Sequence, residues 1–595
     1  MASVRDEMKP VKRAATSSSK DDPGSFLGKL RKRRIVETLA AFIGGGWLIL
    51  EFVDRLLVAH YHFPEKTIDV TFVTILGALL CTLIWRWFSS REKPRKFKLE
   101  LVLIPLVLLV SLIWDINLLL HLKGPETEAK PVAKWKNSIA VLPFIDMSPQ
   151  KDQEYFCDGM TEELINRLSN IKELKVPART SAFFFKGKAQ DIQEVGQKLK
   201  VNTVLEGSVR RAGNELRITA QLVNIADGYH LWSQTYDREL QDIFVLQDEI
   251  SLEIINKLKI ELLGEVKGRV VKRYTDNTEA YDSYMRGMWL LNNKITEEAW
   301  RTAILHFERA IEMDPNFSLA YDGLAGAHLS LCFWHFVSAG EAIPKVKNAL
   351  NQALKIDHEL PEALAQSGLV KFNFEYDWLG GESDIRRALE LNSNCGIAHL
   401  RLSDILLSTG QIDKAIEESS AFLESDPLSL RAQGGFALTL YLAGRYDYAL
   451  QRCRKTLEID PEYPFALAAL GKCYIQKSQF AEAIAVLQKA VAFSGNSTEY
   501  LSYLAYAYVV SGNIEKAREK LGELDNLSRS AYVSKYYLAP IYATMGNKDR
   551  AFELLELAYK ERDANLTDLK NDPQFAVLRP DPRFEMMLRK IGLGK

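Results

Sequence analysis

Residues 464–497 read PFALAALGKCYIQKSQFAEAIAVLQKAVAFSGNS, and units of this length recur along the second half of the chain. Alanine returns every 34 residues without a slip, at positions 415, 449, 483, 517 and 551. A turn glycine has the same spacing at positions 410, 444, 512 and 546, with Ser478 in the missing place. Self-similarity at a fixed period of this size indicates an array of stacked structural repeats.

These units resemble the tetratricopeptide pattern of paired helices. They share its period, its small residue in the first half, its turn glycine and its early alanine in the second half. Counting from these anchors predicts about eight repeats over 278–562, the second lengthened around 331–345 and the third irregular near 371–383. We expect an all-α superhelix in which each helix pair buries its face against its neighbours. Residues 563–595 break the period and predict a capping helix and the carboxyl terminus.

A superhelix of this kind has a concave groove lined by the first helix of each repeat. Tyr441, Lys472 and Tyr506 occupy groove-facing positions in this register, and we predict that they line a protein-binding groove. The alternative for each is a solvated or neighbour-packed side chain. Aromatic residues also concentrate at 333–336 and 372–378 in the irregular repeats. Packing beneath the longer connections is the preferred interpretation, and a partner-docking patch is the other.

Residues 137–265 predict a compact α+β domain. Buried or alternating runs predict strands at 138–144, 173–178, 203–211, 215–224 and 229–236, with helices at 158–170, 189–200 and 241–262. The segment 215–224 alternates apolar and polar residues as a half-buried strand does. Closely spaced strands without a helix between them, following two βα units, predict a sheet with an antiparallel half.

Several stretches of this domain resemble the TolB-amino-terminal-like domain of bacterial membrane-anchored tetratricopeptide-repeat proteins: IAVLPF (139–144), EYFCDGMTEELI (154–165), LEGSVRR (205–211) and HLWSQTYDREL (230–240). Relatives in that group carry a winged-helix DNA-binding domain, as in CadC-like regulators, or a cyclase or protein-kinase domain on the cytoplasmic side. The resemblance therefore implies that this chain carries the sensor part of such a protein. We expect the effector half to be missing here, because only 34 residues precede the first apolar segment.

The chain after about residue 123 shows no clear motif for catalysis or for binding a cofactor or metal. We therefore expect no enzyme activity, no catalytic residues, no cofactor and no metal. Neither GxxxxGK[ST] nor GxGxxG occurs in the sequence. Cys157 beside Asp158, and His230 near Trp232, could be a nucleophile and a base, but neither has a local partner that would tune its pKa. A core thiol and a strand histidine are the preferred interpretations.

Three apolar segments, about 36–58, 68–88 and 101–122, each have the length of a transmembrane helix. Glu51, Asp54 and Asp115 interrupt them, and snorkelling near helix ends explains these acids better than an intramembrane function. A signal peptide is the rival for the first segment, but its hydrophilic lead is long. Residues 1–34 are expected to form a disordered basic tail, and 123–136 a linker.

Positive charge predicts the orientation of these segments. The tail holds ten Lys and Arg residues, and five more stand in 91–98 between the second and third segments. Basic flanks are retained in the cytoplasm. We therefore expect a multi-pass protein of the bacterial inner membrane with a cytoplasmic amino terminus and periplasmic domains after about residue 123.

The amino-acid composition limits the classes of partner that the protein is expected to bind. The 595 residues include 76 Lys and Arg against 77 Asp and Glu, so the net charge of -1 argues against binding nucleic acid. Six cysteines are too few for a disulfide scaffold, and Cys453 with Cys473, although expected to be neighbours, are predicted to stay free thiols. We expect a membrane-anchored interaction scaffold or sensor that contacts the bilayer and a protein or peptide ligand. The alternatives are an accessory subunit that contacts other membrane subunits, or an enzyme with an unrecognised site.

Overall fold

The computed structural model describes residues 35–52, 66–89, 137–188, 191–260, 272–294, 296–334, 336–529 and 531–594. The chain divides into two compact units, Met1–Lys134 and Trp135–Lys595. The predicted tail 1–34, the third apolar segment 101–122 and the linker 123–136 lie outside the described residues.

The first unit contains two described helices, α2 (Ile35–Phe52) and α3 (Lys66–Ser89), which overlap the first two predicted apolar segments. The helices contact each other, and a Cβ atom built on Gly46 would lie 3.2 Å from Cγ2 of Ile75. Large apolar side chains of α2 point outward, among them Trp47, which is 69% exposed, and Leu48, which is 68% exposed. Among the described residues, no helix combines the length and the apolar character that a membrane crossing requires.

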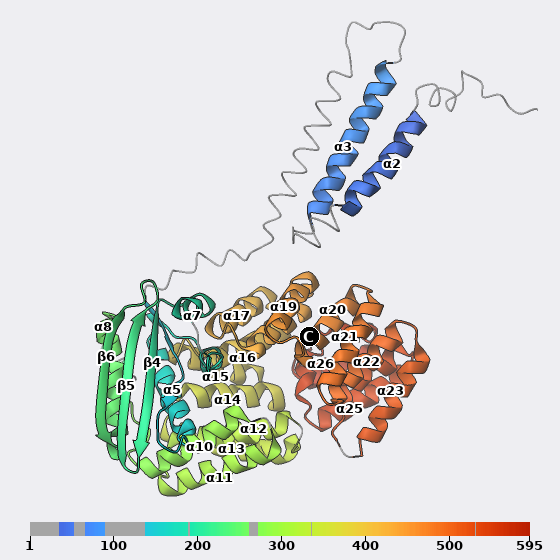
Figure 1. The fold of residues 1–595 in the computed structure, drawn as a ribbon. Helices are drawn as coiled ribbons and strands as arrows, with labels where there is room; N and C mark the ends of the chain where they lie inside the picture. Colours follow the sequence, from blue (N-terminus) through green and yellow to red (C-terminus); the bar gives the residue numbers. More distant parts are fainter. Residues whose placement is uncertain are drawn as a thin grey trace, which may run out of the picture. The chain divides into compact units, whose positions relative to one another are not determined.

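The second unit begins with a mixed α/β domain (Figure 1), as predicted. Its strands are β1 (Asn137–Val141), β2 (Ile145–Asp146), β3 (Leu174–Lys175), β4 (Thr203–Ala212), β5 (Glu215–Asn224) and β6 (His230–Glu239). Its helices are α5 (Glu154–Ser169), α6 (Arg179–Phe183), α7 (Ile192–Leu199) and α8 (Ile243–Lys257), with a short 3-10 turn η2 (Leu240–Asp242) before α8. The first predicted strand ends at Val141, just before Pro143, which has no backbone N–H to donate to a sheet.

The sheet has the strand order β3-β1-β4-β5-β6, with β2 beside β4. The β1–β3, β1–β4 and β2–β4 pairs are parallel, and the long β4–β5 and β5–β6 pairs are antiparallel, which confirms the predicted antiparallel half. Alternate residues of β5, from Leu216 to Leu222, are buried in the core that α5 and α8 share. The other face of β5 and β6 carries exposed polar pairs such as Arg217 with Asp237, whose Nε and Oδ1 atoms are 2.6 Å apart.

Eight helix pairs follow and form the all-α tetratricopeptide superhelix. They are α10 (Thr278–Asn293) with α11 (Glu297–Met313), α12 (Ser318–Phe333) with α13 (Ala339–Ile356), α14 (Pro361–Val370) with α15 (Trp378–Leu391), α16 (Gly396–Thr409) with α17 (Ile412–Ser425), α18 (Leu430–Leu442) with α19 (Tyr446–Ile459), α20 (Pro464–Gln476) with α21 (Phe480–Phe493), α22 (Thr498–Val510) with α23 (Ile514–Leu527), and α24 (Lys535–Thr544) with α25 (Lys548–Lys560). The third pair is irregular because a π-helical turn, η3 (Lys371–Glu375), extends α14.

The periodic small residues have clear structural roles. Ala415, Ala449 and Ala483 are fully buried in the second helices, where a larger side chain would separate the packed helices. The turn glycines adopt positive φ, for example +73° at Gly444, which glycine accepts without steric cost. Ser478 takes the same conformation with φ of +60°, so the backbone turn persists where glycine is absent.

The repeats bury more than their faces toward neighbouring repeats, contrary to the expectation from the sequence. After α25 the chain forms η4 (Ala564–Asp568), η5 (Pro573–Phe575) and α26 (Pro582–Lys590). We call residues 563–594 the carboxyl-terminal clasp, because they return across the repeats. Trp378 Nε1 donates to the Ile591 carbonyl at 2.7 Å, and Asn571 Nδ2 donates to the Leu407 carbonyl at 2.8 Å. In Figure 1 the chain end accordingly lies among the repeats.

The mixed domain also packs across the array. Backbone N and Oγ of Ser181 both donate to Oδ1 of Asp426, at 2.9 and 2.6 Å. Asn394 Nδ2 donates to the Ser169 carbonyl at 2.9 Å. Since α5 also packs on α10, the domain joins the first repeat to the fourth.

Candidate binding site in the hollow of the superhelix

The three predicted groove residues lie on consecutive first helices and come together. Tyr441 is on α18, Lys472 on α20 and Tyr506 on α22, and their exposed fractions are 1%, 7% and 7%. The Lys472 ammonium lies 4.6 Å from the centroid of the Tyr441 ring and 4.8 Å from that of Tyr503. All three side chains are thus almost completely buried, and Lys472 is the charged one among them.

The clasp covers part of the face on which these residues lie. Tyr441 Oη donates to Oδ1 of Asp572 at 3.4 Å, and Tyr536 Oη donates to Oδ2 of the same carboxylate at 3.2 Å. Phe575 is fully buried and its ring centroid is 4.9 Å from that of Tyr536. The aromatic set 372–378 meets the clasp as well, because Asn373 Nδ2 donates to the Ala564 carbonyl at 3.3 Å and Trp378 bonds to Ile591. Within the same set, Tyr376 stacks on Tyr559 of α25. Packing, the preferred interpretation of that set, is what the structure shows.

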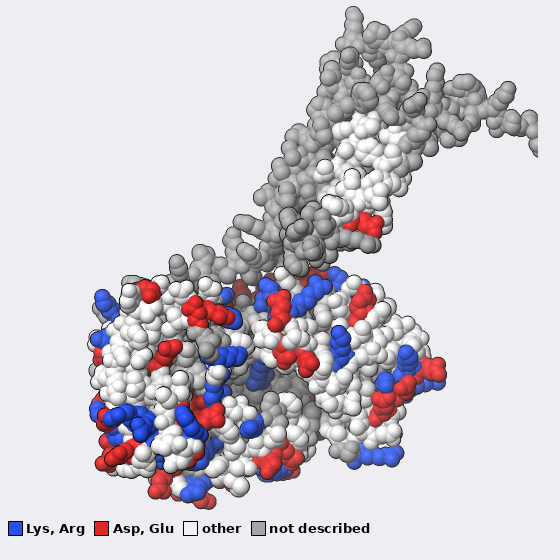
Figure 2. All heavy atoms as spheres, in the orientation of Figure 1, with Lys and Arg blue, Asp and Glu red and all other residues white. Residues whose placement is uncertain are grey.

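The surface of the second unit is hollowed between the side that carries the sheet and the carboxyl-terminal repeats (Figure 2). Arg431 lies at the start of α18. Its side chain is exposed, yet burial and the neighbouring Arg401 guanidinium lower its pKa to about 10.

Further polar groups of the repeats and the clasp affect one another's pKa values. Burial and the Asp404 and Asp572 carboxylates raise the pKa of Asp568 to about 7, and Lys472 opposes the change. Burial raises the pKa of Glu499, again opposed by Lys472. Burial, followed by the charges of Glu499 and Tyr463, raises the pKa of Tyr500.

These polar side chains come from four consecutive first helices, the α19–α20 connection and the clasp, and each interacts electrostatically with another of the set. We call the set the hollow ring: Arg401, Asp404, Arg431, Tyr463, Lys472, Glu499, Tyr500 and Asp568.

Only Lys472 of the hollow ring was found from the sequence. The repeat period carried a signal for two more, because Asp404 stands two periods before Lys472, and Arg431 two periods before Glu499. No local pattern points to Asp568, which reaches the ring because the clasp folds back. The other sequence candidates do not join it. Cys157 is a buried thiol of α5 whose pKa is raised to about 12 by burial, and His230 is exposed at the start of β6.

The cysteines in the described residues are free thiols, including Cys453 and Cys473. Burial raises the pKa of both, with Cys473 at about 12 and adding to the shift at Cys453. Their helices α19 and α20 pack against each other, as the register predicted. Thiols with raised pKa values hold little thiolate and react slowly.

Asp568 makes stability depend on pH. Its pKa is about 7 in the folded chain against 3.8 ordinarily, so the folded state binds its proton more tightly. The resulting stabilisation is complete below pH 4 and is lost as the pH rises through 7. Asp568→Asn removes this loss. Relative to the wild type, the variant should gain at most about 4 kcal/mol in free energy of unfolding between pH 4 and pH 8.

Urea titrations of the full chain in detergent at several pH values from 4 to 8 measure this difference. Asp581→Asn is the control, because the Arg583 contacts lower the pKa of Asp581 to about 2. Both the folded and the unfolded forms of Asp581 are ionised over most of that range, so its variant should show an almost constant difference. A constant difference for Asp568→Asn as well would contradict the raised pKa.

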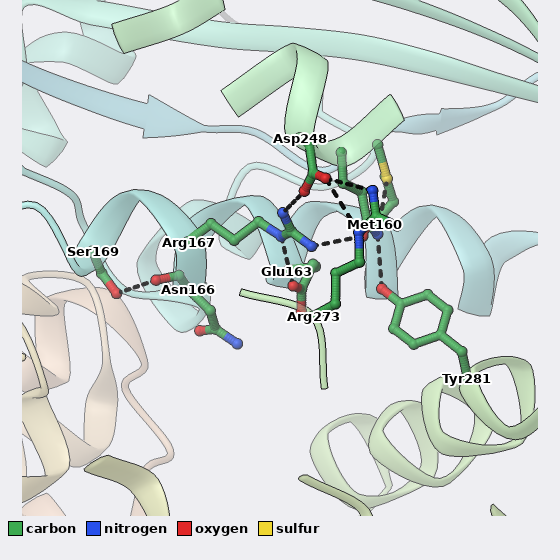
Figure 3. A network of polar contacts seen from close by, with 9 residues as sticks. Met160, Glu163, Asn166, Arg167, Ser169, Asp248, Arg273 and Tyr281 are labelled. Atoms are coloured by element: carbon green, nitrogen blue, oxygen red, sulfur yellow. Dashed lines mark hydrogen bonds and ion pairs between the residues drawn. The ribbon is translucent and has the colours of Figure 1, made fainter. Parts of the chain in front are cut away.

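A second polar cluster joins the mixed domain to the repeats (Figure 3). Arg167 on α5 is 4% exposed, and its Nε and Nη1 atoms bind Glu163 and Asp248 at 2.7 and 2.5 Å. Gln247 Nε2 donates to Tyr281 Oη of α10 at 2.8 Å. Arg273 binds the other oxygen of Asp248 at 2.8 Å. We call these contacts the junction network. They join α5 and α8 of the mixed domain to α10, the first helix of the repeat array.

Comparison with known proteins agrees with this architecture. Residues 135–253 match the family described as HilA/YgeH-like transcriptional regulator, second domain. Residues 400–464 and 440–505 match tetratricopeptide-repeat families. The chain thus contains tetratricopeptide repeats and a domain similar to the second domain of HilA/YgeH-like transcriptional regulators. Repeats of this kind suggest protein–protein interaction.

Two curated relatives show the extent of the similarity. Over 210 residues the chain is 44% identical to "Putative adenylate cyclase 3" of Rhizobium meliloti, covering 35% of this chain and 33% of that protein. Over 265 residues it is 24% identical to the transcriptional regulator HilA of Salmonella typhimurium, covering 43% of this chain and 46% of HilA. The chain thus spans less than half the length of these relatives.

Among solved structures, pilF of Pseudomonas aeruginosa matches 37% of this chain and 94% of its own, with 17% identity and a TM-score of 0.29.

Proposed function

We propose that this protein is a membrane-anchored sensor or scaffold that binds a protein or peptide ligand in the hollow of its repeat superhelix. The observation that carries the proposal is the state of Lys472. Its side chain is almost completely buried, and within the described part of the chain its ammonium has two tyrosine rings beside it but no carboxylate in ion-pair contact. Glu499 and Asp568 interact electrostatically with Lys472 but do not contact it directly, and a ligand carboxylate at ion-pair distance would stabilise the ammonium further.

Crosslinking of the full chain, purified gently in detergent, tests the proposal. Crosslinks to a bound protein or peptide should map to the first helices around Lys472, and Lys472→Met should reduce them. Lys455→Met is the matched control, because Lys455 is exposed on the second helix α19. A reproducible absence of any crosslinked protein or peptide would argue against a binding function, and equal losses in the two variants would argue against this position.

The membrane part of the proposal is supported by the basic flanks of the apolar segments and by the outward apolar side chains of α2. We propose that the segments anchor the chain in a bacterial inner membrane, with the amino terminus in the cytoplasm and the mixed domain and repeats in the periplasm.

Reporter fusions test this topology. Alkaline phosphatase, which is active only in the periplasm, should be active when fused after residue 140 and inactive after residue 95, because the five positive charges of 91–98 are retained inside. The reverse pattern would overturn the orientation, and activity at both points would overturn the second and third spans.

A second candidate is an accessory subunit of a larger membrane complex. The close contact of α2 and α3 at Gly46 supports it, because small residues allow apolar helices to pack against one another. The resemblance to the TolB-amino-terminal-like domain and the match to the HilA/YgeH-like second domain are both consistent with the ligand-binding part of a regulator. We propose binding, and not catalysis, in either case. Native mass spectrometry in detergent separates the two candidates, because a subunit would copurify with other membrane proteins at fixed stoichiometry.

A further inference from the structure

The two edge strands of the mixed domain differ in what covers them. β3 is two residues long and lies against the repeats, where Leu174 is fully buried and its carbonyl accepts a hydrogen bond from Asn394 Nδ2 at 3.3 Å. β6, at the other end of the strand order, is ten residues long and is the outermost strand in Figure 1. A long uncovered edge strand presents a row of backbone groups with which another strand can pair.

The hydrogen-bond pattern shows which backbone groups of β6 are directed away from the sheet. Leu240 N donates to the Asn214 carbonyl at 2.9 Å, one step beyond the opposed pair Glu215 and Glu239. In an antiparallel pair, residues that bond to the neighbouring strand alternate with residues that do not. The outward N–H and C=O groups in the regular part of the strand are therefore those of Ser233, Thr235 and Asp237. Within the described residues, one of these groups is engaged: the Asp237 carbonyl accepts Nη1 of Arg238 at 3.0 Å.

β6 lacks the residues that most often prevent such pairing, because it contains no proline, glycine or lysine. Other charged side chains can also block an edge, but two of those on β6 already have partners. Arg217 Nε binds Oδ1 of Asp237 at 2.6 Å, and Arg238 Nη2 binds Oε2 of Glu249 at 3.1 Å. An incoming strand would therefore meet no unpaired charge at these two positions.

The strand is also complementary to itself. Thr235 is exposed near the middle of β6, and its Oγ1 lies 3.1 Å from Oγ1 of Thr219 on β5. A twofold axis through Thr235 would form three kinds of pair between two copies: Thr235 with Thr235, Ser233 with Asp237, and Trp232 with Arg238. The first pair extends the threonine contact, the second gives a carboxylate a hydroxyl donor, and the third places a cation beside an aromatic ring. No like charges stand opposite each other in this register.

We propose that the protein forms a dimer in which β6 pairs antiparallel with β6 of a second copy, so that the two sheets become one continuous sheet. An identical strand suits this edge because a twofold axis satisfies the outward backbone groups of both copies at once and makes each complementary side-chain pair twice. The dimer is independent of the ligand proposed for the repeats.

Sedimentation velocity of the full chain in detergent tests the pairing. Thr235→Lys places two ammonium groups opposite each other at the axis, so it should raise the dimer Kd at least about 10-fold. Thr219→Lys is the matched control, because the same change one strand away leaves the two positions about 14 Å apart, three strand spacings, across the interface. This control should dimerise like the wild type. Equal thermal unfolding of the two variants shows that both are folded.

Thiol crosslinking is the second measurement, since Thr235→Cys changes the side chain little. A short bismaleimide should join two copies of Thr235→Cys into a covalent dimer. Thr219→Cys should give no more covalent dimer than the wild type, whose described cysteines are buried or partly buried.

A wild type that is monomeric at every concentration overturns the pairing. So does a dimer that Thr235→Lys leaves intact, or equal crosslinking from positions 235 and 219. Crosslinking of Thr235→Cys to a different protein in native membranes would show that the edge takes a foreign strand, and would overturn the second copy as its occupant. None of these results decides the proposed binding function, which the crosslinks around Lys472 test separately.

Discussion

Phe575→Ala should lower the free energy of unfolding by about 3 to 5 kcal/mol, the usual cost of removing a large side chain from a well-packed core. Phe575 is fully buried in η5 and packs on Tyr536 of the last repeat. Its loss opens a cavity where the clasp meets the repeats. The expected result is a lower urea midpoint and faster proteolysis within 563–594, because the clasp would detach before the helices unfold.

Phe493→Ala is the matched control, because the same side chain is 46% exposed at the end of α21. It should change the free energy of unfolding by less than about 1 kcal/mol. If Phe575→Ala and Phe493→Ala had equal effects in tryptophan fluorescence, the clasp would not be part of the folded core.

Arg167→Met should also be severely destabilising, by about 3 to 5 kcal/mol, because it leaves Glu163 without its cation in a buried site. Asp248 keeps Arg273, so the loss concentrates on α5. Hydrogen exchange followed by mass spectrometry should show faster exchange in α5, α8 and α10, the three helices that the junction network joins.

The comparison variant is Arg217→Met on β5, because Arg217 is 57% exposed and binds Asp237 on the surface of the sheet. Exposed ion pairs contribute little to stability, so this variant should unfold much like the wild type. If exchange in α10 is the same in the two variants, the network does not couple the mixed domain to the repeats.

The local elements were predictable, because their signals lie within one repeat or one strand. Ala449 and Gly444 mark a helix contact and a turn, and the alternation from Leu216 to Leu222 marks a strand with one buried face. The clasp was not predictable. The sequence period gives no information on packing between distant segments. It therefore could not show whether Phe575 packs on Tyr536 or caps the array from outside.

The same limit explains the candidate site. The register placed Tyr441, Lys472 and Tyr506 on the first helices of their repeats, because helix position follows from the period. That they line a protein-binding groove stays a prediction, and the period carried no information on what packs over them. Asp572 of the clasp accepts a hydrogen bond from Tyr441, and Asp568 belongs to the hollow ring only because the clasp folds back onto the repeats.

Two ties across the array change its mechanics. A repeat superhelix with free ends behaves as a spring, because each unit touches only the next and small rotations add up along its length. Here Ser181 and Asp426 are linked across 245 positions, and Trp378 and Ile591 across 213. Load applied to the repeats therefore meets these ties before it can extend the coil. In a pulling experiment the array should resist as a braced frame and yield in one large step when a tie breaks, instead of lengthening gradually repeat by repeat.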